Sequence, residues 1–198
     1  ITASPANDTI TPLMALGAWV VLKSARGERR VPLNEFYSGV RKNVMQPDEM
    51  LVEIAFKGMQ ANQSGTFIKM ALRRAQAISV VNIAMVLTLE AGIVRDAAIT
   101  LGAVAPTIIH AVEAERYLQG KQLDDEVITL AAELTRQAAR PIDDIRGSAA
   151  YRREMTRVIA RRGLEAIRDN ETQAGFPAEP ILLWGKDQPQ PATKPMGA

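Results

Sequence analysis

The chain contains no cysteine among its 198 residues. Without thiols it forms no disulfide and supplies no thiolate ligand to zinc or to an iron–sulfur cluster. Any redox chemistry here therefore needs an electron carrier that cysteine does not bind. The chain also has a single histidine, His110, which excludes a metal site built on paired histidines of this chain. At the apolar start of an expected helix, this histidine is predicted to be packed or solvent-facing rather than catalytic.

Long hydrophobic runs are also lacking. The two longest, residues 80–89 and 99–109, are interrupted by polar residues, glycine or proline and are shorter than a membrane span. Lysine and arginine number 24 against 22 acidic residues, so bulk charge does not predict a nucleic-acid partner. The first residues have neither the basic segment nor the apolar run of a signal peptide. We therefore expect a cytoplasmic protein that does not span a membrane.

The common catalytic and phosphate-binding motifs are missing as well. Neither the P-loop nor the dinucleotide-binding glycine fingerprint occurs, so this chain offers no phosphate anchor to a nucleotide. Ser148 follows a glycine and is expected to cap a helix rather than to act as a nucleophile, because no base is near. Asp143 and Asp144 with Arg146 are expected to form a salt-bridged loop, an acid/base site being the alternative.

What the chain does have is a clear order of strand and helix patterns. Residues 17–33 contain two short alternating runs around a polar turn at 24–27, which predicts a β-hairpin. A short helical pattern precedes the hairpin at residues 12–16, and alternation over Met50–Phe56 predicts a further strand. Residues 58–65 carry no apolar period and have a glycine at each end, which indicates a domain boundary.

A sheet is predicted after that boundary. Two long β-like runs are divided by Ala91 and Gly92, and a shorter run at residues 66–74 precedes them. The apolar residues from Val81 to Leu89 alternate with smaller ones, as in a sheet with one well-buried face and one face covered by small residues. We expect an antiparallel sheet of about three strands.

Three helices are predicted to follow the sheet. The first runs from Ile108 to a stop at Gly120, and the second opens with the capping acids Asp124 and Asp125. The third begins at Ser148 and is expected to keep its arginines largely outside. These are Arg152, Arg153, Arg157, Arg161 and Arg162. A nucleic-acid-binding face is the alternative for them, but glutamates interrupt the charge and no aromatic platform accompanies it.

The last stretch, from about Asn170, is rich in proline and has no period, so it is expected to be extended or disordered. Its one apolar island, ILLWG at residues 181–185, is either a docking patch for another subunit or a segment that folds back on its own domain. The predicted units are 1–57, 58–169 and the tail 170–198.

Several motifs in series resemble one known family. They are ITASPANDT, LNEFYSGVRK, DEMLVEI, FIKMALRRAQAISVVNIA, LGAVAPT and ARPIDDIRGSAAYRREM. Together these motifs resemble the FAD-binding medium subunit of the molybdenum hydroxylases, the group of carbon monoxide dehydrogenase and xanthine dehydrogenase. The resemblance covers residues 1 to about 168, in order, and leaves out the tail.

The resemblance implies an α+β fold. Residues 1–57 would form the second half of a vanillyl-alcohol-oxidase-like FAD-binding domain. Residues 58–169 would form a C-terminal domain with a three-stranded antiparallel sheet and a helical bundle. The first subdomain, with its glycine-rich loop, would precede Ile1, so the chain is expected to be N-terminally incomplete.

The same resemblance implies FAD contacts at five residues. Asp8 corresponds to the family's acidic contact, Ile1 to an apolar loop contact, and Met50 with Leu51 to a contact through backbone and apolar groups. Lys69 corresponds to the lysine near the isoalloxazine ring. From its position alone, a strand lysine is expected to point to solvent. With the resemblance, its stem is expected to pack on the ring and its ammonium to stabilise negative charge there.

The implied function is electron relay in a larger enzyme. Substrate would react at a molybdopterin cofactor in a large subunit, and electrons would cross two [2Fe–2S] clusters in a small subunit. FAD of the medium subunit would pass them to NAD or a quinone-type acceptor, in a dimer of heterotrimers. The alternative is a scaffold that docks the partner subunits without binding flavin.

Overall fold

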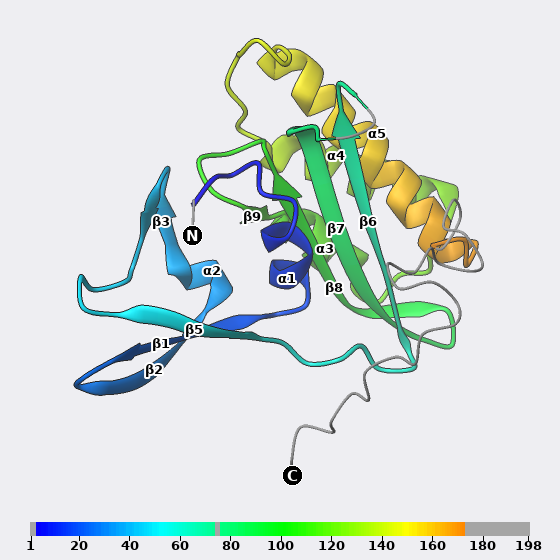
Figure 1. Ribbon diagram of the computed structural model, residues 1–198. Helices are drawn as coiled ribbons and strands as arrows, with labels where there is room; N and C mark the ends of the chain where they lie inside the picture. Colours follow the sequence, from blue (N-terminus) through cyan, green and yellow to red (C-terminus); the bar gives the residue numbers. More distant parts are fainter. Residues whose placement is uncertain (1–2, 74–75, 173–198) are drawn as a thin grey trace, which may run out of the picture.

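The computed structural model describes residues 3–73 and 76–172, arranged as two larger antiparallel sheets with helices packed on them and one two-stranded hairpin (Figure 1). The first part of the chain contains α1 (Ile10–Ala15), β1 (Trp19–Ser24), β2 (Gly27–Pro32), α2 (Leu33–Phe36), β3 (Tyr37–Gly39), β4 (Lys42–Asn43) and β5 (Met50–Ala55). The second part contains β6 (Gln63–Ala71), β7 (Ser79–Glu90), β8 (Ile93–Gly102), β9 (Ile109–His110), α3 (Val112–Leu118), α4 (Asp125–Ala138) and α5 (Ala149–Arg168). Ile1 and all but the first three residues of the predicted tail lie outside the described residues. No helix of the described part is long and apolar enough to cross a membrane.

The first sheet has the strand order β2-β1-β5. Its hairpin turns between Ser24 and Gly27, which confirms the predicted turn. The core beneath it is formed by β1, α2 and α1, with Leu22, Leu33 and Phe36 almost fully buried.

Residues 33–43, where the sequence pattern predicts no helix or strand, contain the short helix α2 and the hairpin of β3 and β4. Leu33 and Phe36 lie on one side of α2 and are buried, and the Phe36 ring packs edge-on against Tyr37 with centroids 4.9 Å apart. A single helical turn is too short to show a hydrophobic period in the sequence. Burial of the Leu33 and Phe36 side chains, rather than helix propensity, therefore stabilises α2.

The second sheet has four strands in the order β6-β7-β8-β9, so the expectation of three strands was wrong by one. The fourth, β9, is only two residues long and pairs with Thr100 and Leu101 at the end of β8. The turn from β7 to β8 is a two-residue loop in which Ala91 and Gly92 both have positive φ, as tight hairpins require.

The predicted start of the first helix at Ile108 was also wrong. Ile109 and His110 are extended in β9, and the Ala111 amide donates to the Ile99 carbonyl at 2.8 Å, so helix α3 begins only at Val112. The apolar residues from Ile108 onward have helical spacing, but the backbone groups of Ile109 to Ala111 hydrogen-bond to β8 and so cannot form the first turn of a helix.

Helices cover both faces of the second sheet (Figure 1). Val81 and Ile83 belong to the large core that α3, α4 and α5 cover. Asn82 and Thr100 point to the other face, where both bond to Thr11 of α1. The face that was expected to carry only small residues is therefore buried as well, because the first part of the chain packs on it.

Candidate functional site

Two of the residues implicated by sequence, Asp8 and Lys69, lie in contact although 61 residues separate them. Asp8 lies in the loop before α1, and Lys69 lies on β6. The ammonium of Lys69 donates to the carboxylate of Asp8 and to the backbone carbonyl of Ala77, the latter at 2.6 Å. The Asp8 side chain is 40% exposed and that of Lys69 is 27% exposed, so a ligand can still reach the pair.

A buried set of hydrogen bonds supports the Asp8 carboxylate from below. Ser79 Oγ donates to Asp8 Oδ1 at 2.5 Å, and the amide nitrogen of Asn82 donates to Ser79 Oγ at 3.0 Å. Thr11 Oγ1 donates to the amide oxygen of Asn82 at 2.7 Å, so both polar ends of this fully buried side chain are satisfied. We call Asp8, Lys69, Ser79, Asn82 and Thr11 the Asp8 network.

Ser79, Asn82 and Thr11 were not singled out from the sequence. The sequence feature that could have indicated them is the presence of two polar residues, Ser79 and Asn82, within an otherwise apolar run. Asn82 is the direct cross-strand neighbour of Lys69, so the strand pairing places both on one face.

The charge state of Asp8 follows from these contacts. Burial raises the pKa of the carboxyl, but hydrogen bonds from Lys69 and Ser79 and the charge of Lys69 outweigh it, and the pKa lies below the ordinary 3.8. Because the pKa is depressed, the network stabilises the fold fully above pH 3.8 and loses this contribution as the pH falls through the lowered value. At neutral pH Asp8 is therefore a carboxylate that accepts hydrogen bonds.

Gly102 is required next to this network. A Cβ at this position would lie 2.1 Å from the amide oxygen of Asn82 and 2.7 Å from Thr11 Oγ1. The following residue, Ala103, has a φ of +65°, a conformation that costs a residue with a side chain about 1–2 kcal/mol. Its amide donates to the Pro5 carbonyl at 2.6 Å, which ties this turn to the loop that carries Asp8.

Arg152 of α5 contradicts the expectation that this helix keeps its arginines outside. It is 4% exposed, and its guanidinium donates to the carbonyls of Val80 at 3.2 Å and Ala103 at 2.9 Å. A second nitrogen donates to Asp144 at 2.5 Å. The helical spacing alone places this arginine near a boundary of the apolar stripe, and the two carbonyls with the carboxylate make its burial possible.

The loop before α5 agrees with its prediction. Asp144 bonds Arg146 at 3.0 Å as well as Arg152, and Asp143 accepts from the Ala149 amide at 2.6 Å. Burial raises the pKa of Asp144, but hydrogen bonds from the Arg146 amide and from Arg152 lower it by more than burial raises it. The pKa therefore lies below its ordinary value, and the carboxyl is ionised at neutral pH. Ser148 accepts from the backbone of the first turn and caps α5, as expected.

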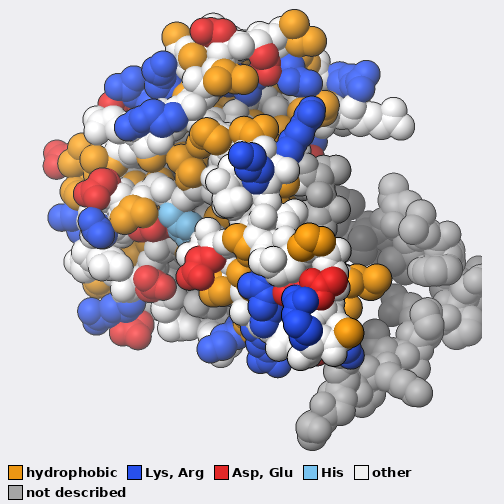
Figure 2. Space-filling view, turned by 90° about the vertical axis from the view of Figure 1, so that its left-hand side faces the viewer, with side chains coloured by type: hydrophobic (Ala, Val, Ile, Leu, Met, Phe, Trp, Pro, Cys, Tyr) orange, Lys and Arg blue, Asp and Glu red, His pale blue; other side chains and the backbone are white. Residues whose placement is uncertain are grey.

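A cavity of 680 Å³ lies beside the network. Ser79, Ala103 and Arg152 form part of its wall, together with the loop residues Ser4 and Pro5. Its mouth carries the exposed apolar side chains Val40, Ile78 and Ile142. Figure 2 shows exposed hydrophobic side chains on one face of the molecule, interspersed with basic and acidic side chains. An apolar wall with a few convergent polar groups suits a flat organic ring with a polar edge.

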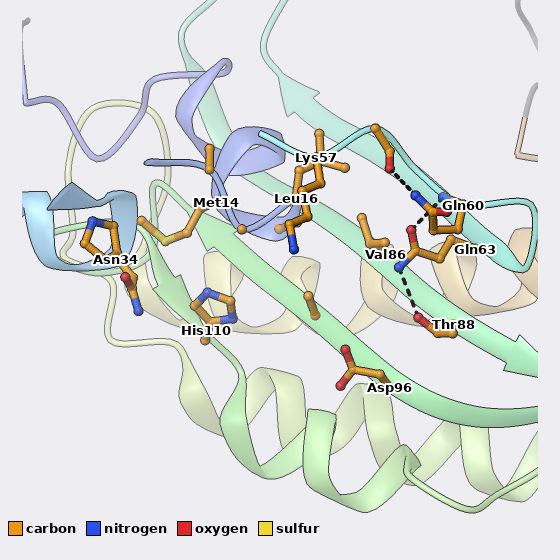
Figure 3. A pocket seen from close by; sticks show the side chains of 16 residues that line it. Met14, Leu16, Asn34, Lys57, Gln60, Gln63, Val86, Thr88, Asp96 and His110 are labelled. Atoms are coloured by element: carbon orange, nitrogen blue, oxygen red, sulfur yellow. Dashed lines mark hydrogen bonds between the residues drawn. The ribbon is translucent and has the colours of Figure 1, made fainter. Parts of the chain in front are cut away.

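A second cavity, of 510 Å³, lies between α1, the segment that follows β5 and the second sheet (Figure 3). Lys57, Asp96 and His110 line it, and His110 Nδ1 lies 2.7 Å from a carboxylate oxygen of Glu115. None of the residues of the Asp8 network lines this cavity. His110 is therefore packed against a carboxylate in a cavity wall away from the Asp8 network.

The other residues implicated by sequence do not belong to the Asp8 network. Met50 and Leu51 lie at the start of β5, in the first sheet, whereas Lys69 lies in the second. Met50 is 68% exposed, while Leu51 packs against the first core and pairs with Leu22 of β1. Ile1 lies outside the described residues. Within residues 3–73 and 76–172, no group of acidic and histidine side chains could hold a metal ion.

Two family models match the chain. The FAD binding domain in molybdopterin dehydrogenase matches residues 1–56, and the CO dehydrogenase flavoprotein C-terminal domain matches residues 66–167. The glyceraldehyde dehydrogenase medium chain of Sulfolobus acidocaldarius is 28% identical over 165 residues, which are 83% of this chain and 58% of that one. The carbon monoxide dehydrogenase medium chain of Afipia carboxidovorans is 31% identical over 161 residues, 81% of this chain and 56% of that one.

The fold agrees with solved structures. Carbon monoxide dehydrogenase of Hydrogenophaga pseudoflava superimposes with a TM-score of 0.80 at 30% identity, over 84% of this chain and 57% of that chain. The chain thus has the mixed α/β fold of these medium chains and spans a little more than half of their length. It belongs to the family of FAD-binding flavoprotein subunits of the molybdopterin dehydrogenases.

Proposed function

We propose that this chain forms part of the FAD pocket in the flavoprotein subunit of a molybdenum hydroxylase, an oxidoreductase. The observation that carries the proposal is the Asp8 network, in which an accessible carboxylate and an accessible ammonium are held together beside a partly apolar cavity. When bound, FAD would carry electrons from the [2Fe–2S] clusters of a partner subunit to NAD or a quinone-type acceptor.

The residues of this chain would bind and orient the cofactor. Asp8, fixed by Ser79, would accept a hydrogen bond from a hydroxyl or amide of FAD, and Lys69 would place its stem against the ring and its ammonium at a polar edge. Met50 and the backbone of Leu51 would add apolar and polar contacts from the first sheet, and Ile1 an apolar contact from its loop. The chemistry of this donor set fits a neutral ring with polar atoms along one side.

The wider organisation is proposed on the same basis. Residues 1–57 would be the second half of a vanillyl-alcohol-oxidase-like FAD-binding domain, residues 58–169 a C-terminal α+β domain, and residues 170–198 an extended tail. The partners would be a large subunit with the molybdopterin cofactor and a small iron–sulfur subunit, in a cytoplasmic dimer of heterotrimers.

The absorption spectrum of the purified enzyme that contains this chain tests the proposal. We expect the flavin bands near those of protein-bound FAD, and loss of these bands when the flavin is extracted. A stably assembled enzyme with no flavin in this subunit would reject the proposal. If this chain still captured the large and small subunits under those conditions, the scaffold function would replace it.

A further inference from the structure

We infer that Arg152 is a positioning residue for the flavin site, acting through Asp8 from the far side of the second sheet. The inference rests on the proposed function of Asp8. Arg152 is 4% exposed and reaches from α5 to the end of the sheet where the Asp8 loop crosses it. Although Arg152 forms part of the cavity wall, its guanidinium hydrogen-bonds, within the described part of the chain, only to Val80, Ala103 and Asp144 and to none of the residues expected to contact FAD. Its effect on Asp8 therefore passes through the backbone.

Two short paths connect Arg152 to Asp8. In the first, the guanidinium donates to the carbonyl of Val80, and the preceding residue, Ser79, donates to Asp8 Oδ1 at 2.5 Å. In the second, the guanidinium donates to the carbonyl of Ala103, whose amide donates to Pro5 at 2.6 Å in the loop that carries Asp8. One side chain thus fixes both backbone segments that support the carboxylate.

The second path passes through strained backbone. Ala103 has a φ of +65°, and it is held by a hydrogen bond at its amide and another at its carbonyl. Residues in such a conformation persist only where their surroundings hold them. With the bond from Arg152 removed, the turn can relax and carry the Pro5 carbonyl, and with it the Asp8 loop, away from its present place.

Stability alone gives a poor account of this arginine. Its charge is balanced by Asp144, but its Nε has no hydrogen-bond partner among the described residues. Buried ion pairs can often be replaced by apolar side chains without loss of stability, and an unpartnered buried N–H is a cost. Fixing the geometry of a neighbouring binding site explains why the guanidinium, with its several donors, suits this position.

A double-mutant cycle on the holoenzyme tests the inference. The dissociation constant for FAD is measured, after removal and re-addition of the flavin, for Arg152→Lys, Asp8→Ala and the double variant. We expect Arg152→Lys to weaken FAD binding about tenfold, as loss of a supporting contact does at other preorganised sites. In the Asp8→Ala background the same change should have less than about a twofold effect, because its route to the cofactor is already cut. Arg162→Lys, an exposed arginine of the same helix, is the matched control and should leave binding unchanged.

Fully additive losses, or no effect of Arg152→Lys, would overturn the inference, since a merely structural arginine weakens both backgrounds alike. If Arg152→Lys fails to assemble, Asp144→Asn, which removes the carboxylate that holds Arg152, goes through the same cycle with the same expectation. A wild-type enzyme without FAD would instead reject the proposed function. A wild-type enzyme that binds FAD but gives an additive cycle would reject only the inference.

Discussion

Asp8 is the residue whose proposed role in binding FAD rests on the largest number of observed contacts. Its carboxylate is ionised, accessible and held by Ser79 and Lys69, so it is suited to binding rather than to proton transfer. We predict that Asp8→Ala lowers FAD affinity about 10- to 150-fold, because a hydrogen bond to a charged group contributes about 1.5–3 kcal/mol. Flavin content per assembled enzyme measures this. Asp96→Ala, which removes a carboxylate of the other cavity, is the control, and unchanged flavin content in Asp8→Ala would remove Asp8 from the site.

Lys69 is expected to matter for electron delivery more than for assembly. We predict that Lys69→Ala slows reduction of the external acceptor severalfold more than it slows substrate oxidation at the molybdenum site. Rapid-reaction measurements of the two half-reactions separate these steps. If both rates fall equally, the variant is misassembled and the assigned role is wrong. Lys57→Ala, an exposed lysine that lines the other cavity, serves as the control.

Gly102 gives a test of the network that does not depend on flavin. In Gly102→Ala the new methyl group would meet the side chains of Asn82 and Thr11, both of which are fully buried. We predict a loss of about 1–3 kcal/mol in the free energy of unfolding, the usual cost of overpacking. Urea denaturation measures it. Gly58→Ala, where a Cβ would meet nothing within 4 Å, should stay close to wild type, and equal stability of the two variants would contradict the close approach.

At the scale of elements, α4 depends on a cap that the sequence predicted. The Asp124 side chain accepts from the Val127 amide at 2.8 Å at the exposed start of the helix. We predict that Asp124→Ala lowers the free energy of unfolding by about 1 kcal/mol, whereas Asp124→Asn, which keeps the acceptor, changes it little. The urea midpoints of the two variants should differ clearly, and coinciding midpoints would show that the cap contributes nothing.

The long elements could be predicted because their signals are local. The alternation of β7, the turn at Ala91 and Gly92, and the caps Asp124 and Ser148 each lie within a few residues of the structure they specify. The short elements α2 and β9 could not be predicted, because contacts with distant strands determine them.

The site could be predicted only in part, for the same reason. The resemblance implicated Asp8 and Lys69, and the structure brings them into contact. Thr11, Asn82 and Arg152 were missed because each has a hydrogen-bond partner 49 or more residues away in the chain. A polar residue within an apolar run signals that a buried partner exists, but not which residue it is.

For the whole molecule, the two hydrophobic cores are held together by side-chain and backbone contacts as well as by the connecting chain segment. Residues 56–62 between β5 and β6 are exposed throughout, while α1 of the first part packs on the second sheet through Thr11. We predict that cleavage at a protease site inserted between Gly58 and Met59 leaves the two pieces associated. Size-exclusion chromatography of the cut protein should give one peak at the uncut position, with two bands on a denaturing gel. Separate peaks would show that the backbone connection holds the parts together.

The close approach at Gly102 also restricts the order in which the sequence can change over evolution. A side chain at position 102 is blocked mainly by the amide oxygen of Asn82. Replacement of Asn82 by a smaller residue would therefore have to come first, and would leave Thr11 and Ser79 without a partner they now have. Positions 11, 82 and 102 should therefore vary as a group among homologues, with glycine at position 102 lost only in sequences that have already lost asparagine at position 82.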